Sequence, residues 1–409
     1  MMKKKYLTLL AASTFAFFMQ ACDHNSIAAG EPAFDKDDSS SSVKEDKSSS
    51  SVKEDEKSSS SSAEVVSGSV FVIGSDYKTG EIRWVENDSI SKKSLDIYQD
   101  TKLVTIDGKL YALERSGSDN VALIDTKSKK VSWEASLDDY SNPTDIVAAG
   151  KDEAWVALEG TDSFVKISLK DGKVVKTVKT TDFISKGGYS PNLADFEVSG
   201  DTLFAVFQRY ISEYDSAGNW TGTSYPKGLL AMYKLNDGAL LDTIQLATSN
   251  PSAVKVVKGN VYVATMGAYN ASYGTDADDE RGVEKVDLSK KSSELYVSGK
   301  KIGAGVYNFV ADYEAGVAYA VAYKGMDMTT YATEAPVVKV DLASGSVETI
   351  KGIDDAEGGL AIDAATGILY VGDRTYGAEA IYAYNGKEVT KVPSAAEKAL
   401  APYSIAIVE

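Results

Sequence analysis

Side chains able to carry out nucleophilic or metal chemistry are scarce in this chain. Its 409 residues include one histidine, His24, and one cysteine, Cys22, both near the N-terminus. Ser-His-Asp and Cys-His nucleophiles, His-ligated zinc and thiolate metal clusters are therefore excluded from the rest of the chain. Any enzymatic chemistry there must work without histidine.

At two predicted strand ends, an acidic residue directly precedes an arginine. Glu114 precedes Arg115 and Asp373 precedes Arg374, and Glu159 stands at a similar position of the repeat described below. These groups indicate either a ring of charge that binds a polar ligand or ordinary surface ion pairs, each of small energetic value. Paired carboxylates would also allow glycoside hydrolysis without histidine.

One loop concentrates acidic residues, namely Asp276, Asp278, Asp279 and Glu280. Oxygen ligands of this kind suit Ca²⁺, but the glycine and glutamate spacing of an EF-hand loop is absent. We expect a solvated acidic loop tip, and no metal or cofactor in the protein. Asp276, Asp278 and Asp279 are the residues to inspect for a metal site.

Overall charge excludes one class of partner. The chain has 43 Lys and Arg against 60 Asp and Glu, a formal net charge of −17. Binding to phosphate backbones requires clustered basic residues, and none are found along the body of the chain. Nucleic-acid binding is therefore not expected.

The N-terminus reads as a targeting segment. Three lysines, Lys3 to Lys5, precede a mostly apolar stretch at residues 7–19, which is shorter than the roughly 20 residues that span a bilayer. The sequence Met-Gln-Ala-Cys at residues 19–22 resembles the lipobox of bacterial lipoproteins. That resemblance implies a signal peptide at residues 1–21 and acylation of Cys22. Ordinary cleavage, with Cys22 as an incidental thiol, is the alternative.

Residues 22–66 form a serine-rich segment in which the sequence SSSSVKED occurs twice. A stretch with so few large apolar side chains cannot offset the entropy of ordering, so we expect a disordered tether. Together with an acylated Cys22, it would hold the following domain at a membrane of the cell envelope. The expected membrane is the outer one, with its periplasmic or surface side left open.

A repeat organises residues 67–409. An aromatic residue flanked by small or branched apolar residues recurs seven times, with spacings of 40 to 58 residues. The seven aromatic residues are Phe71, Tyr111, Trp155, Phe204, Tyr262, Tyr319 and Tyr370. Each lies in one of four short strands per repeat, which we label A to D, with the aromatic in strand B. This period predicts an all-β, seven-bladed β-propeller rather than a two-domain β arrangement.

The turn after strand C has the pattern Asp-x-x-x-Gly, as at Asp341 to Gly345. Because of this turn, the chain resembles bacterial YVTN-type and quinoprotein-like β-propellers. The first repeat lacks a strand A, and residues 401–407 read as an additional one. We therefore expect the C-terminal strand to complete blade one and to remove two exposed sheet edges.

The loops that follow strand B differ in length between blades. They are short in blades two and three but long at residues 209–228, 268–281 and 324–335, in blades four, five and six. In propellers these loops share one face of the disc, and a rigid scaffold with clustered insertions commonly carries a binding site. The aromatic candidates are Tyr210, Tyr214, Trp220, Tyr225, Tyr269, Tyr273 and Tyr331. The alternative is that these loops only pack on each other and cover the channel.

These features favour a lipid-anchored, extracytoplasmic propeller that acts as a non-enzymatic binding or scaffold module. The expected partner is a polysaccharide, a peptide or an envelope protein, held on the face of blades four to six. The alternative is a hydrolase independent of histidine, similar to a glycosidase or a lactonase, that uses carboxylates at this face.

Overall fold

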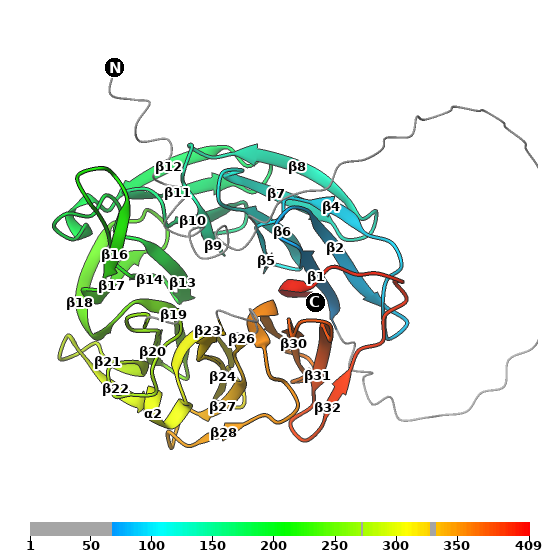
Figure 1. Cartoon of the computed structure of the whole chain (residues 1–409). Helices are drawn as coiled ribbons and strands as arrows, with labels where there is room; N and C mark the ends of the chain where they lie inside the picture. The colour runs from blue at the N-terminus through cyan, green and yellow to red at the C-terminus, as the bar shows by residue number, and fades with distance from the viewer. Residues whose placement is uncertain (1–67, 271–272, 328–332) are drawn as a thin grey trace, which may run out of the picture.

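The computed structural model describes residues 68–270, 273–327 and 333–409. These residues form seven antiparallel sheets arranged radially around a central axis (Figure 1), which confirms the predicted seven-bladed β-propeller. Each blade carries strands A to D from the axis outward. Among these residues, no helix combines the length and apolarity needed to cross a membrane.

The strands follow the predicted order within each blade. Blade one contains β33 (Pro402–Val408), β1 (Ser69–Ser75), β2 (Gly80–Glu86), β3 (Ser89–Ile90) and β4 (Leu95–Ile97). Blade two contains β5 (Thr101–Ile106), β6 (Lys109–Glu114), β7 (Asn120–Asp125) and β8 (Lys130–Ser136). Blade three contains β9 (Pro143–Ala148), β10 (Glu153–Leu158), β11 (Ser163–Ser168) and β12 (Val174–Lys179).

The remaining blades repeat this arrangement. Blade four contains β13 (Leu193–Ser199), β14 (Thr202–Phe207), β17 (Lys227–Lys234) and β18 (Leu240–Ser249). Blade five contains β19 (Pro251–Val257), β20 (Asn260–Thr265), β21 (Gly282–Asp287) and β22 (Ser292–Ser298). Blade six contains β23 (Gly305–Asp312), β24 (Val317–Tyr323), β27 (Val337–Asp341) and β28 (Val347–Thr349). Blade seven contains β29 (Leu360–Ile362), β30 (Leu369–Asp373), β31 (Ala380–Tyr384) and β32 (Val389–Lys391).

Two additional hairpins and three short helical turns interrupt the blades. The hairpins are β15 (Ile211–Tyr214) with β16 (Trp220–Ser224), and β25 (Gly325–Met326) with β26 (Thr333–Glu334). The turns are η2 (Thr181–Phe183), α2 (Gly299–Ile302) and η3 (Ala356–Gly358). Both hairpins lie between strands B and C, in blades four and six, where the sequence indicated long loops.

The core is divided among the contacts between blades. The described residues form seven hydrophobic clusters, one between each pair of adjacent blades, including blades seven and one. Strand B is buried on both of its faces, as in β24, which explains its continuous apolar sequence. The repeated aromatics also bond across blades: Trp155 Nε1 donates to the Leu235 carbonyl at 2.7 Å, and the Tyr262 hydroxyl to the Leu342 carbonyl at 2.9 Å.

The recurring turn after strand C has a local cause. The Asp341 carboxylate accepts hydrogen bonds from the backbone N–H groups of Ala343 and Ser344, at 3.0 and 2.7 Å. Gly345 completes the turn with φ of 68°, a left-handed conformation that glycine adopts without strain. The Asp-x-x-x-Gly pattern therefore encodes an Asx-type turn.

Closure of the ring occurs in blade one. Strand β33 pairs with β1 from Ser69 opposite Val408 to Ile73 opposite Ser404, before a bulge next to Gly74. The last strand of the chain thus becomes the innermost strand of the first blade, as expected. It leaves no unpaired edge on β1.

Side chains connect the innermost strands of neighbouring blades. The carboxylate of Asp145 accepts from the Phe196 N–H at 3.1 Å, and that of Asp195 accepts from the Val254 N–H at 3.0 Å. The Ser404 hydroxyl accepts from the Leu103 N–H at 3.0 Å. Because strand A is the inner edge of each sheet, its N–H groups would otherwise lack partners from its own blade.

Candidate functional site

A cavity of about 1160 Å³ runs along the central axis, and the innermost strands of all seven blades line it. One end opens where the B–C and D–A connections emerge, and we call this end the mouth. Its lining residues are Tyr77, Asp100, Arg115, Glu159, Tyr210, Tyr225, Tyr269, Tyr307, Tyr323, Glu357, Arg374 and Tyr403. Five of these are charged and seven are tyrosines, so the mouth is both aromatic and polar.

Five tyrosines from blades four, five and six form a continuous arc at the mouth. Ring centroids are 6.4 Å apart for Tyr210 and Tyr225, and 6.1 Å apart for Tyr225 and Tyr269. The arc continues through Tyr323, 6.3 Å from Tyr269, to Tyr307, 5.6 Å from Tyr323. These tilted and edge-to-face contacts hold the rings in place and leave the Tyr307 side chain 41% exposed inside the cavity.

A second aromatic group lies at the other side of the mouth, in blade one. The rings of Tyr77 and Tyr403 meet edge to face at 6.1 Å. The Arg374 guanidinium lies 5.0 Å from the first ring centroid and 5.6 Å from the second. Its Nη1 also donates to the Pro402 carbonyl at 2.6 Å, so this arginine joins blade seven to the closing strand.

Arg115 and Asp100 form an ion pair beside Tyr403. The distance from Arg115 Nη2 to Asp100 Oδ1 is 2.6 Å, and the Tyr403 hydroxyl donates to the same oxygen at 2.8 Å. Burial alone would raise the pKa of Asp100, but the Arg115 charge and these hydrogen bonds lower it below its ordinary value. This carboxylate is therefore ionised and neutralised by its partner.

Glu159 is held by neighbours from two other loops. The Tyr210 hydroxyl donates to its Oε1 at 2.7 Å, and the Asn142 amide donates to its Oε2. Burial raises the pKa of Glu159 despite these bonds. The contact ties the blade-three loop to the first tyrosine of the arc.

Glu357 follows the capping residue Asp355 in η3 and is half-buried. Burial, with repulsion from the Asp355 carboxylate, raises the pKa of Glu357 to about 7. Arg374 and the Thr333 hydroxyl oppose this shift without cancelling it. Glu357 is thus half ionised near neutral pH, whereas burial raises the pKa of Tyr77 and Tyr225 to about 12 and keeps those phenols neutral.

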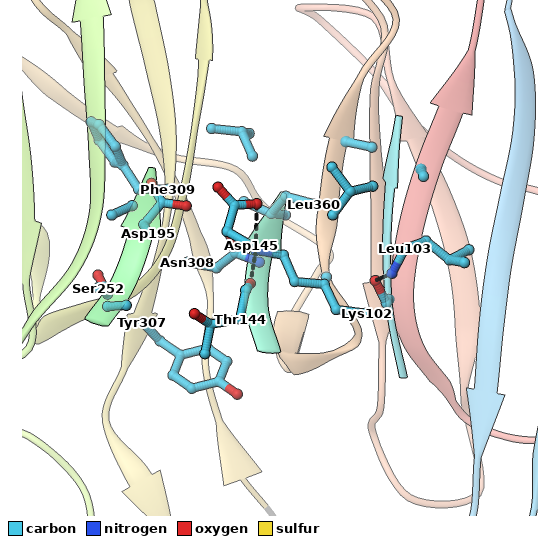
Figure 2. A pocket seen from close by; sticks show the side chains of 18 of the residues that line it. Lys102, Leu103, Thr144, Asp145, Asp195, Ser252, Tyr307, Asn308, Phe309 and Leu360 are labelled. Atoms are coloured by element: carbon cyan, nitrogen blue, oxygen red, sulfur yellow. Dashed lines mark hydrogen bonds and ion pairs between the residues drawn. The ribbon is translucent and has the colours of Figure 1, made fainter. Parts of the chain in front are cut away.

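Deeper in the channel lies a compact charged network. Lys255 Nζ is 2.9 Å from an oxygen of Asp195 and 3.7 Å from one of Glu197, whose other oxygen accepts from the Tyr313 hydroxyl at 2.9 Å. Figure 2 shows the neighbouring arrangement, in which Lys102 bonds to the Thr144 carbonyl at 2.8 Å and lies 3.4 Å from Asp145. These groups bond mainly to one another and to backbone, which fits a structural role in joining blades.

The structure brings five of the sequence candidates together. Arg115, Tyr210, Tyr225, Tyr269 and Arg374 all line the mouth. They come from strand B ends or B–C loops of blades two, four, five and seven. Glu159, named with the carboxylates, lines it as well.

Other candidates do not line the cavity. The Glu114 carboxylate is buried and accepts from Ser118 and Asn120, at 2.6 and 3.0 Å. That of Asp373 is buried and accepts from the Thr375 N–H at 2.8 Å. Tyr214 and Trp220 pair on the β15–β16 hairpin, and Tyr273 belongs to the blade-five loop. Cys22 and Tyr331 lie outside the described residues.

The acidic loop of blade five has internal partners. Asp278 is paired with Arg281 at 2.8 Å, and Asp276 accepts from the Asn270 amide at 2.9 Å. Within the described ranges, no three His, Cys, Asp or Glu side chains come together as Asp276, Asp278 and Asp279 would have to for a metal site. Arg281 also donates to the Ala268 carbonyl at 2.7 Å, so it fixes its own loop.

The mouth residues that the sequence analysis missed are Tyr77, Asp100, Tyr307, Tyr323, Glu357 and Tyr403. Tyr307 and Tyr403 begin strands A, and Glu357 lies in a D–A connection. D–A connections open on the same face as B–C loops, so the first residues of each strand A were a usable signal. The long B–C loops could be recognised from the sequence because they differ in length between blades. The missed residues lie in segments whose length does not stand out.

No known protein family matches this chain, and no curated protein matches it. Solved structures do resemble it. A functionally unknown protein from Desulfotomaculum acetoxidans is 13% identical with a TM-score of 0.53, covering 84% of this chain and 99% of that one. A putative 6-phosphogluconolactonase from Bacteroides fragilis is 12% identical with a TM-score of 0.52, covering 86% and 100%. Hydrazine synthase of Kuenenia stuttgartiensis is 13% identical with a TM-score of 0.51, covering 74% and 87%.

At such identities the likeness shows the fold alone. The class defined by topology and comparison is that of the seven-bladed β-propellers.

Proposed function

We propose that this protein is a non-enzymatic binding module that takes its ligand into the mouth of the propeller. The observation that carries this proposal is the arc of five packed tyrosines at the open end of the central cavity. Pre-positioned aromatic rings offer contact area at little entropic cost, and charged groups around them orient a ligand. The expected ligand is part of a polysaccharide, a peptide or an envelope protein.

Two tyrosines test this function. Tyr225→Ala/Tyr307→Ala removes one ring within the arc and the ring at its end, and should weaken binding at least about tenfold. Binding would be measured on glycan and peptide arrays and then by calorimetry with the ligands found. Tyr376→Ala is the matched control, because Tyr376 is 91% exposed and does not line the cavity. Binding that survives the double variant would place the ligand elsewhere.

Trp220→Ala separates the mouth from the neighbouring hairpin. Trp220 is 40% exposed on β16 and lies outside the cavity lining. A ligand confined to the mouth should bind this variant as tightly as the wild type. A loss equal to that of the double variant would extend the binding surface over β15 and β16.

We also propose that the propeller is held at the cell envelope by acyl chains on Cys22, with residues 22–66 as a tether. The lipobox-like sequence at residues 19–22 supports this proposal. Labelled palmitate should be incorporated into the wild type and not into Cys22→Ser. In Triton X-114 partitioning, the wild type should enter the detergent phase and the variant the aqueous phase.

A second candidate function has one observation in its favour. Asp100 and Glu357 both line the mouth, and their surroundings move their pKa values in opposite directions. One protonated and one ionised carboxyl is the arrangement of a glycosidase or another acid–base hydrolase. Chromogenic glycosides and lactones should be turned over if this candidate is correct, and Glu357→Gln should abolish the turnover.

A further inference from the structure

We propose that the group bound in the mouth is an organic ammonium ion, which lies against the tyrosine rings with Glu357 as its counter-ion. This inference rests on the proposed function and specifies the chemistry of its ligand. Three sources share this chemistry: a lysine side chain, an amino sugar and a small quaternary ammonium compound.

Three tyrosine rings of the arc are inclined to one another at the mouth. Tyr269, Tyr307 and Tyr323 are neighbours at 5.6 to 6.3 Å and present rings at interplanar angles of 35° and 85°. Tyr307 is 41% exposed and Tyr323 only 6%, so Tyr307 supplies the accessible ring face, and its inclined neighbours form the wall of a partial cage. A cage of aromatic faces binds an ammonium ion through the negative potential of each ring.

Both arginines of the mouth are held by contacts within the protein. The Arg115 guanidinium pairs with the Asp100 carboxylate. Arg374 lies against two tyrosine rings and donates to the Pro402 carbonyl, so it is engaged with the protein. Among the described residues, no Lys or Arg forms an ion pair with Glu357. Arg374 lowers the pKa of Glu357 but forms no ion pair with it, so Glu357 is a carboxylate of the mouth that a cationic ligand can neutralise.

The lining of the whole cavity carries more acidic than basic side chains. Eight of its side chains are acidic and four are basic. The basic ones are Lys102, Arg115, Lys255 and Arg374, and the first three contact carboxylates within 3.4 Å. A narrow cavity with an excess of one charge attracts ligands of the opposite charge.

Glu357 is placed to act on the cage. The titratable and charged groups that surround it come from blades one, five, six and seven: Tyr77, Tyr269, Tyr307, Tyr323, Asp355 and Arg374. The phenols stay neutral over the accessible range because burial raises their pKa values. A bound cation would favour the ionised form of Glu357, so binding near neutral pH should release a proton.

Matched ligand pairs test the proposal with the processed full-length protein. A lysine peptide is compared with its acetyl-lysine counterpart, a glucosamine oligosaccharide with its N-acetylated counterpart, and choline with a neutral alcohol of similar size. In at least one pair, the cationic member should bind about tenfold more tightly. The pair that discriminates identifies the source of the ammonium group.

Glu357→Gln should remove this discrimination, whereas Glu348→Gln, on the exposed face of β28, should retain it. In the wild type, the affinity for the cation should fall about tenfold between about pH 8 and about pH 6, as the carboxylate is protonated. The glutamine variant should show no such dependence. A ligand with a fixed charge, choline or the lysine peptide, serves for this series.

The outcomes separate the two proposals. If neutral members bind at the mouth as tightly as their cationic counterparts, and Tyr225→Ala/Tyr307→Ala abolishes that binding, the ammonium inference is wrong and the binding function stands. If pH dependence persists unchanged in Glu357→Gln, Glu357 is not the counter-ion and the inference is also wrong. If no ligand of either kind or from the arrays binds at the mouth, the proposed function itself fails.

Discussion

At the residue scale, Glu357 is held where its charge is unfavourable. A carboxyl whose pKa is raised on folding binds a proton more tightly in the folded than in the unfolded protein. Its contribution to stability is therefore fully present below the ordinary pKa near 4.5 and is lost as pH rises through the folded pKa of about 7. Retaining such a group at neutral pH suggests a use other than stability.

A stability measurement tests whether folding raises the pKa of Glu357. Glu357→Gln should raise the thermal midpoint relative to the wild type at about pH 8, because it removes a destabilised charge. The two midpoints should approach each other below about pH 4, where the wild-type carboxyl is mostly protonated in both states. Calorimetry over this range measures the difference, and a midpoint that is lower at pH 8 would contradict the environment described for Glu357.

Asp100 has the opposite dependence. Its pKa is lowered on folding, so its stabilising contribution is present above the ordinary value near 3.8 and is lost as pH falls through the folded pKa. Asp100→Asn leaves the Arg115 charge without its partner and should cost roughly 2 to 3 kcal/mol at neutral pH. Urea titrations at about pH 7 and about pH 3 should show this cost at the higher pH and a smaller one at the lower.

The sequence could predict only some of the mouth at this scale. Arg115 and Arg374 were found because each follows a strand B that the repeat identifies, and Tyr210, Tyr225 and Tyr269 because they lie in long loops. Which direction a side chain takes at a strand end depends on twist and on bulges, such as those next to Gly74 and between Val306 and Phe309. Glu114 and Arg115 are adjacent in sequence, yet one is buried in its loop and the other lines the cavity.

At the element scale, the closing strand β33 joins the two ends of the ring. It pairs with β1 and contributes Ile405 and Ile407 to the cluster between blades seven and one. Tyr403 and Ser404 from the same strand bond to Asp100 and to the Leu103 N–H. One strand therefore supplies sheet pairing, core packing and part of the mouth.

Removing this strand should be severe. Deletion of residues 401–409 should lower the thermal midpoint by more than about 10 °C or yield aggregated protein, because β1 becomes an exposed edge. Thermal melting and size-exclusion chromatography measure these effects. Ser404→Ala is the mild comparison, expected to cost about 1 kcal/mol through the lost bond to Leu103. An unchanged midpoint after the deletion would refute the closure.

The strands of the blades could be predicted from the sequence better than the residues of the mouth. The repeated aromatic and the Asp-x-x-x-Gly turn have local physical causes, so their spacing was enough to place strands B and C. The β15–β16 and β25–β26 hairpins were expected only as loops. Their strands are short and carry no apolar alternation, and their residues belong to none of the seven hydrophobic clusters between blades.

At the scale of the whole molecule, stability is distributed around the ring. Each of the seven hydrophobic clusters lies between two blades, so no blade has a complete core alone. The propeller should therefore unfold as one cooperative unit. Residues 67–409, expressed without the preceding segment, should melt within about 2 °C of the processed protein, and calorimetry should show a single transition. Two separated transitions would contradict a closed ring.

The pairing of Ser69 with Val408 also fixes the face at which the chain enters the disc. Strand β1 begins at Ser69 and ends just before Tyr77 at the mouth, and its 7 residues span about 20 Å along the axis. The polypeptide therefore enters the disc at the rear, on the side away from the tyrosine arc. An attachment through the N-terminal segment would therefore join the disc at the face opposite the mouth and leave the open cavity accessible to ligands.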